Sequence, residues 1–140
     1  MKYLFILISF LSFIQFSLAA EKAYTLQSGD ASLSVVKDGK RLSLQTGNAH
    51  YLSLNAPYVV TLEVNAETLN GYYSSVKEEK GSLVCIAKLK SSHGTVFHVK
   101  DVFAPDTENH FRMDREVTIE KIGKGDDYFN SYFCLLYTSP

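Results

Sequence analysis

ASLSVVKDGKRLSLQT, residues 31–46, decides the fold, because it describes two short strands around a turn. Apolar and polar residues alternate on both sides of Asp38-Gly39-Lys40, and a period of two is typical of strands with one buried face. Asp-Gly tolerates the positive φ of a tight primed turn, so the segment predicts a β-hairpin. Within residues 41–45 the two leucines share one side and three polar residues the other. This strand should therefore have one face in water.

Similar segments, separated by turn residues, fill most of the remaining chain. We expect strands at residues 58–64, 68–77, 82–90, 95–103, 110–121 and 128–133, with a bulge at Gly71 in the second. Residues 48–57 are polar and irregular, and Pro57 marks the entry of the next strand. Roughly eight strands joined by short turns, with no helix to cover a face, predict an all-β, antiparallel β-sandwich.

The chain opens with the features of a secretory signal peptide, residues 1–19. Met1-Lys2 gives a positive start, Tyr3 to Phe16 is apolar, and Ser17-Leu18-Ala19 supplies the small residues that signal peptidase requires. The apolar run is shorter than the ~20 residues that a membrane-spanning helix needs. We therefore expect a signal-peptide helix and then an exported domain, periplasmic or extracellular, without a membrane attachment after cleavage.

The last segment, Cys134–Pro140, fits no part of the preceding pattern and resembles the translated read-through of a sequencing adapter. We expect an incomplete β-sandwich domain at residues 20–133, a non-native tail at 134–140, and further natural sequence beyond Phe133. A sandwich that is cut within a strand leaves an apolar face and an unpaired edge exposed. The isolated fragment is therefore expected to be marginally stable or to aggregate.

Composition excludes some classes of partner. The formal net charge of −1 and the pI of about 6.4 give no electrostatic footprint for nucleic acid or an anionic membrane. Aromatic residues make up 13% of the chain but include no Trp, which disfavours a stand-alone carbohydrate-binding module. Tyr72-Tyr73 should place one ring in the core and one outward. The outward ring could stack on a sugar, although we favour an ordinary exposed aromatic.

Cysteine usage predicts little. Cys85 alternates with Leu83 and Ala87, which favours a small buried apolar residue. Cys134 is the only other cysteine, so a disulfide in the oxidising compartment would depend on the suspect tail.

No metal, cofactor or catalytic site can be placed on this sequence. A structural zinc site needs closely spaced pairs of ligands, and the histidines are scattered. They are His50, His93, His98 and His110. Ser91-Ser92-His93 lacks a third group and an oxyanion donor, and Gly123-x-Gly125 lacks the helix that follows a phosphate loop. Asp126-Asp127 lacks the spacing and the closing Glu of a calcium loop.

Charged residues of the longest strand allow two interpretations. Asp114 and Glu116 share its polar face about 6.6 Å apart along the backbone, a spacing compatible with the carboxylate pair of glycoside hydrolysis. Solvated or ion-paired surface carboxylates are the favoured interpretation. Arg115 shares the apolar side, so it must face inward or be paired. Asp101 and Asp106 are expected to cap the turn around Pro105.

Three segments together resemble a known family. They are Val99-Lys100-Asp101-Val102-Phe103, Phe111-Arg112-Met113-Asp114-Arg115-Glu116-Val117-Thr118-Ile119 and Phe129-Asn130-Ser131-Tyr132-Phe133. The chain from Tyr24 to Phe133 resembles the N-terminal β-supersandwich, or galactose-mutarotase-like, domain of large secreted glycoside hydrolases from gut Bacteroidetes. In that family the sandwich precedes a six-hairpin (α/α)6 toroid.

The resemblance implies a non-catalytic domain of an exported polysaccharide-degrading enzyme, packed on a helical domain. The family's catalytic carboxylates lie mostly in the toroid, so none can be carried over to a position of this chain. Arg115 would bridge strands or meet the next domain. The implied partners are the helical toroid and a polysaccharide or oligosaccharide, without a cofactor.

Two other classes stay open: a secreted carbohydrate-binding or adhesion module without enzymatic activity, and a mutarotase-like or lyase-associated sandwich. An aromatic-lined open groove would favour binding, whereas a flat apolar face would favour the accessory domain.

Overall fold

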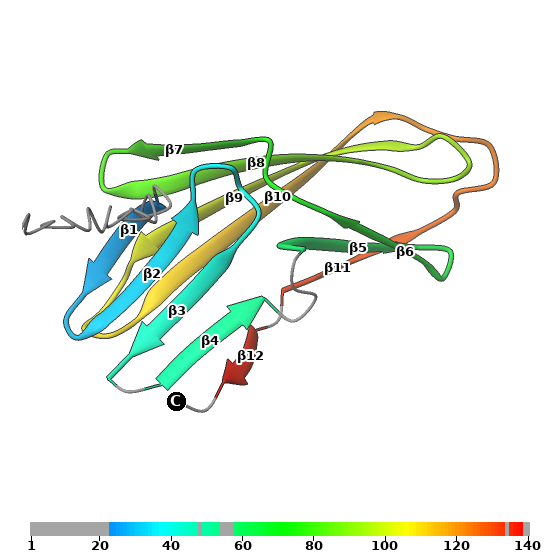
Figure 1. Cartoon of the computed structure of the whole chain (residues 1–140). Coiled ribbons are helices and arrows are strands. Elements are labelled where there is room, and N and C mark those ends of the chain that lie inside the picture. The colour runs from blue at the N-terminus through cyan, green and yellow to red at the C-terminus, as the bar shows by residue number, and fades with distance from the viewer. Residues whose placement is uncertain (1–22, 48, 54–57, 134, 139–140) are drawn as a thin grey trace, which may run out of the picture.

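The computed structural model describes residues 23–47, 49–53, 58–133 and 135–138. In chain order, its strands are β1 (Ala23–Ser28), β2 (Ala31–Val36), β3 (Leu42–Thr46), β4 (Ala49–Ser53), β5 (Val60–Val64), β6 (Glu67–Gly71), β7 (Ser75–Glu79), β8 (Ser82–Lys90), β9 (Val96–Pro105), β10 (Phe111–Lys121), β11 (Phe129–Tyr132) and β12 (Leu135–Thr138). They form antiparallel sheets with the orders β1-β2-β3-β4-β12, β10-β9-β8-β7 and β11-β5-β6 (Figure 1). The predicted all-β, antiparallel sandwich is confirmed, while the expected signal-peptide helix lies outside the described residues.

The three sheets pack in two layers. In Figure 1 the long strands β8, β9 and β10 run across the molecule; at one end β9 and β10 overlap the five-stranded sheet, and at the other end the three-stranded sheet lies below them. β1 contacts β7, β8 and β9, and β6 contacts β8, so the four-stranded sheet holds the other two together.

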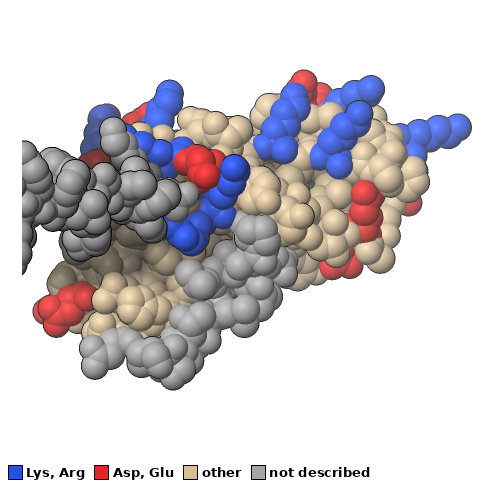
Figure 2. All heavy atoms as spheres, viewed as in Figure 1, with Lys and Arg blue, Asp and Glu red and all other residues tan. Residues whose placement is uncertain are grey.

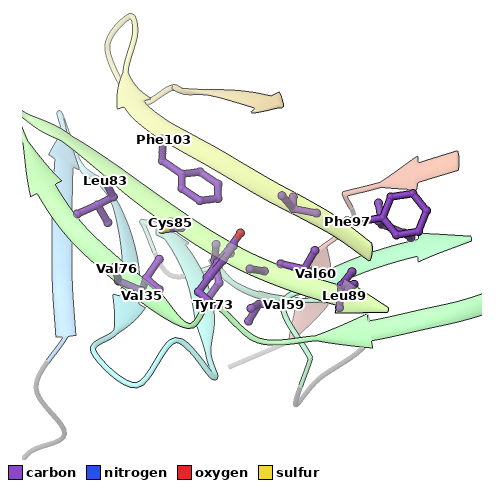
Figure 3. Packing of buried hydrophobic residues seen from close by; sticks show 14 of the residues in the cluster. Val35, Val59, Val60, Tyr73, Val76, Leu83, Cys85, Leu89, Phe97 and Phe103 are labelled. Atoms are coloured by element: carbon purple, nitrogen blue, oxygen red, sulfur yellow. The ribbon is translucent and has the colours of Figure 1, made fainter. Parts of the chain in front are cut away.

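The core lies between these layers, and its buried strand residues come from β1–β3 and β5–β9 (Figure 3). On β8 and β9 the buried residues have odd numbers and the residues between them are more exposed, as the period of two requires. The apolar ones are Leu83, Cys85, Ala87, Leu89, Phe97, Val99 and Phe103. Each large side chain that is fully buried in this way contributes about 1.5–3 kcal/mol of apolar burial.

The predicted hairpin is confirmed as β2 paired with β3, but its turn differs from the expected type. The loop spans residues 37–40, and of its residues only Gly39 has a positive φ, of 73°. The Gly39 N–H donates to the Val36 carbonyl at 2.8 Å, and the Lys40 N–H donates to the Asp38 carboxylate at 3.0 Å. This is a type I turn closed by a left-handed glycine, because Asp38 accepts an Asx-type hydrogen bond instead of adopting positive φ.

Two expectations about strands are wrong. Residues 49–53 form β4 and pair with β3, although residues 48–57 were expected to be irregular. Gly71 is not a bulge within one strand, because β6 ends there and the chain crosses to a different sheet to begin β7. With β1 and β12, which match none of the expected strands, the described part of the chain contains twelve strands and not roughly eight.

The last described strand, β12, pairs antiparallel with β4 at the edge of the five-stranded sheet. Whether residues 134–140 are native stays a prediction. Cys134 lies outside the described residues, so its pairing with Cys85 does too. Cys85 is buried with a free thiol, as expected, and burial together with the nearby Asp101 raises its pKa to about 12.

Candidate functional site

An open groove of about 650 Å³ lies where the chain crosses from the three-stranded to the four-stranded sheet. Its walls are the end of β6, residues 72–74, the last part of β8, and the turn that carries Asp38 and Lys40. The volume lies within the ~300–1,000 Å³ typical of ligand sites.

Backbone contacts fix the crossover that forms the groove. A Cβ at Gly71 would lie 2.5 Å from Cδ2 of Leu89, so glycine lets the end of β6 approach β8 closely. The Tyr73 N–H donates to the Gly39 carbonyl at 3.1 Å, and the next amide donates to the Ile86 carbonyl at 2.7 Å. The hairpin turn and β8 therefore hold the crossover from both sides.

Tyr72 and Tyr73 point in opposite directions, as predicted. Tyr73 is 1% exposed and lies in the core, whereas Tyr72 is 36% exposed and lines the groove. The rings of Tyr72 and Tyr58 pack at a centroid distance of 5.2 Å with an interplanar angle of 35°. Tyr72 therefore gives the groove an exposed aromatic side, and Tyr58 supports its ring from outside the groove.

Lysines dominate the charge of this groove. Lys40, Lys88 and Lys90 line it with a single carboxylate, that of Asp38. Lys40 lies 3.6 Å from Asp38, and Lys88 lies 2.7 Å from Glu120, all with exposed side chains. Figure 2 shows lysine and arginine side chains gathered over the upper side of the view, where β7 and β8 run in Figure 1.

A second polar cluster is buried beneath the crossover. The Tyr73 hydroxyl donates to Asp101 Oδ2 at 2.5 Å, and Arg115 donates to both oxygens of Asp101 at 2.6 Å. Arg115 Nη1 also donates to Ser131 Oγ at 3.0 Å and to the Tyr132 carbonyl at 2.7 Å. The Arg115 side chain thus joins β9 and β10 to β11.

The electrostatics of this cluster are those of a closed structural network. Burial, followed by the adjacent carboxylate, raises the pKa of Tyr73 well above its ordinary value. Burial opposes the charge of Arg115, but its hydrogen bonds to and attraction by Asp101 outweigh this and raise its pKa. Within the described residues no buried side-chain nitrogen or oxygen lacks a partner. The cluster therefore has no group directed at a ligand.

The network confirms the expectation for Arg115 and corrects the one for Asp101. Arg115 faces inward and is paired, as its position on the apolar side required. Asp101 was expected to cap a turn but lies within β9, fully buried, directly opposite Arg115 in the sheet register. Asp106 does lie in the turn, where its N–H donates to the His110 carbonyl at 3.1 Å.

A third cluster surrounds Asp126 in the loop between β10 and β11. Its carboxylate accepts hydrogen bonds from Ser91 Oγ at 2.6 Å and from Thr95 Oγ1, and lies 2.9 Å from His93 Nδ1. Thr95 Oγ1 accepts from the Gly123 N–H at 2.7 Å. The hydrogen bonds from Ser91 and Thr95, and then His93, lower the pKa of Asp126 to about 2. Asp126 therefore fastens its loop to the β8–β9 turn.

Asp126 is the third group that the sequence around Ser91 lacked, but the geometry does not make a triad. Ser91 and His93 each contact the carboxylate, whereas a nucleophile must contact its base and the base its carboxylate. Ser91 and Asp126 are 35 residues apart in the chain, so no local sequence pattern predicts their contact.

The remaining charged candidates occupy separate surface positions. Asp114 accepts from Arg112 at 2.9 Å and Glu116 lies 4.0 Å from Lys100, so both are ion-paired on the polar face of β10, as favoured. Hydrogen bonds from Lys88 and then His98 lower the pKa of Glu120. Within the described ranges, no cluster of three His, Cys, Asp or Glu side chains could hold a metal ion.

Comparison with known proteins found no matching family model, no matching curated protein and no matching solved structure. Among the residues that the structure describes, no helix is long and apolar enough to cross a membrane.

Proposed function

We propose that this chain is a non-catalytic β-sandwich domain of an exported carbohydrate-active enzyme that packs against a helical catalytic domain. The observation that carries the proposal is an apolar strip along the β10–β11 side, which we call the β10–β11 strip. Its residues are between 39% and 73% exposed and are Ile119, Ile122, Tyr128, Tyr132 and Phe133. Ile119, Ile122 and Tyr128 line one hollow of this surface, and exposed apolar side chains that gather in this way mark an interaction face.

The strip is held in place from beneath. Beneath the strip Phe129 packs on Phe97 at a ring-centroid distance of 5.3 Å, and Phe133 of the strip itself packs on the buried Phe103 at 5.9 Å. Arg115 anchors β11, because its side chain donates to the backbone carbonyl of Tyr132. A rigid apolar surface reduces the ordering cost of docking, which supports a permanent domain contact.

The natural full-length transcript tests this proposal. We expect the reading frame to continue past Phe133 into a helical region that contains acidic residues. When the sandwich and that region are expressed as one chain, the β11 amides should exchange with deuterium more slowly than in the sandwich alone. A series of further β modules, or a stop codon directly behind Pro140, would contradict it.

A second candidate function is saccharide binding in the open groove. Its aromatic side, the exposed Thr68 and Asn70 of β6, and the lysines of β8 are the residue types that bind sugar hydroxyls and ring faces. In affinity electrophoresis, the mature chain should be retarded by a polysaccharide that it binds. Tyr72→Ala should weaken the retardation, whereas Tyr128→Ala, which removes an exposed tyrosine outside the groove, should not.

A further inference from the structure

We propose that the groove binds an acidic oligosaccharide, one that carries carboxylate or sulfate groups; this inference rests on saccharide binding as the second candidate function. The groove is the one defined above, between the β6–β7 crossover and the end of β8.

The charge of the groove differs from that of the whole chain. Three lysines and one aspartate line it, a formal balance of +3 − 1 = +2, whereas the chain carries −1. Counting Glu120, which pairs with Lys88, still leaves +1. The groove therefore carries more positive charge than the chain as a whole, which favours an anionic ligand there.

The three lysines are available to a ligand to different degrees. Lys90 has no carboxylate within ion-pair distance among the described residues. The Lys40–Asp38 pair is loose and exposed, a type of pair worth about 0–1 kcal/mol, so an incoming anion can replace Asp38. Lys88 is held by Glu120 and keeps further donor hydrogens.

The spacing of these donors suits an extended chain with repeated charges. Lys88 and Lys90 both lie on the outer side of β8, two residues apart, which places them about 6.6 Å apart along the backbone. Across the groove, Thr68, Asn70 and Tyr72 repeat with the same period. A cationic row opposite a polar and aromatic row would contact the acidic groups of a sugar chain on one side and its hydroxyls and ring faces on the other.

The matched pair of ligands is polygalacturonate and its fully methyl-esterified form, because they share a sugar backbone and differ in charge. The assay is affinity electrophoresis of the mature chain, with poly-glutamate as an acidic ligand without sugars. We expect retardation by polygalacturonate and at least about fivefold weaker binding of the ester.

The variant is Lys88→Gln with Lys90→Gln, and the control is Lys77→Gln with Lys121→Gln, which removes equal charge from exposed strand positions outside the groove. The first pair should weaken polygalacturonate binding roughly five- to tenfold, and the control less than about twofold. Both pairs are surface changes that leave the fold intact.

The outcomes separate the two proposals. Equal binding of acid and ester, with loss in Tyr72→Ala, would overturn the acidic ligand and leave saccharide binding. Equal binding of polygalacturonate and poly-glutamate would overturn the saccharide ligand. Equal losses in both lysine pairs would overturn the groove as the site that binds the acidic ligand. No binding of either polysaccharide would overturn both proposals.

Discussion

Arg115 is the residue whose removal should cost the sandwich most. Arg115→Met leaves the buried Asp101 carboxylate without its charge partner and frees β11 from its anchor. Loss of one partner of a buried pair costs about 3–5 kcal/mol. Urea unfolding of the mature chain, followed by near-ultraviolet circular dichroism, should show a destabilisation of this size or a chain already unfolded in water.

The control is Arg112→Met, because Arg112 pairs with Asp114 on the surface of the same strand. An exposed pair contributes about 0–1 kcal/mol. Similar unfolding midpoints for the two variants would contradict the structural role of Arg115.

Gly39 is the second residue whose replacement should strongly destabilise the protein. Its φ is 73°, and a Cβ there would lie 1.9 Å from the carbonyl oxygen of Tyr73. Gly39→Ala should therefore destabilise the protein by about 3 kcal/mol or more, combining left-handed strain with a backbone clash.

Gly47→Ala is the matched control, since Gly47 has a φ of 54° but a Cβ added there would meet no atom within 4 Å. It should cost only the left-handed strain, about 1–2 kcal/mol. Equal unfolding midpoints for the two alanine variants would show that the contact between the hairpin turn and the crossover does not matter.

The sequence contains a signal for the buried pair of Asp101 and Arg115 that the prediction used only for Arg115. Asp101 has the same parity as Phe97, Val99 and Phe103, which puts a carboxylate on an apolar face and demands a partner. Arg115 makes the same demand on the adjacent strand. Asp101 was instead assigned to the turn because it lies close to Pro105 in the sequence. The sequence also does not give the strand register that places Asp101 opposite Arg115.

Among the elements, the loop of residues 122–128 depends on pH. The folded pKa of Asp126 is about 2 against an ordinary 3.8, so the charged carboxylate favours the folded loop. This contribution is fully present above pH 3.8 and is lost as the pH falls towards 2. The protection of the Gly123 amide, measured as its exchange rate relative to the intrinsic rate at each pH, should therefore decrease over this interval.

Asp126→Asn is the control for this pH effect, because it cannot titrate. Its loop should be weakened at neutral pH and should show little further change between pH 4 and pH 2. A loop that opens equally with pH in the Asn variant would assign the effect to other carboxylates.

Elements with strong local patterns were predicted well, and those without them were not. The strand at residues 82–90 was predicted with the bounds it has in the structure, because turn residues flank an apolar run that ends in alternation with lysines. β4 was missed because Leu52 interrupts the short alternation of Ala49, His50 and Tyr51, and it is a strand because β3 pairs with it.

Over the whole molecule, the sequence predicts the fold class but not the groove. The sandwich follows from period-two patterning alone. The groove needs Gly71, Tyr73 and the Asp38 turn to meet across two sheets, and the Asp126 cluster needs a loop to meet a distant turn. Long-range pairings of this kind are set by topology, which local spacing does not encode.

The most direct test of the central claim is the thermal stability of purified residues 20–133. If the β10–β11 strip is a domain contact that lacks its partner, the isolated sandwich should aggregate or unfold in a shallow transition below ~50 °C. A cooperative, reversible transition above ~50 °C in a monomeric sample would contradict the account, because such a domain would not need the strip covered.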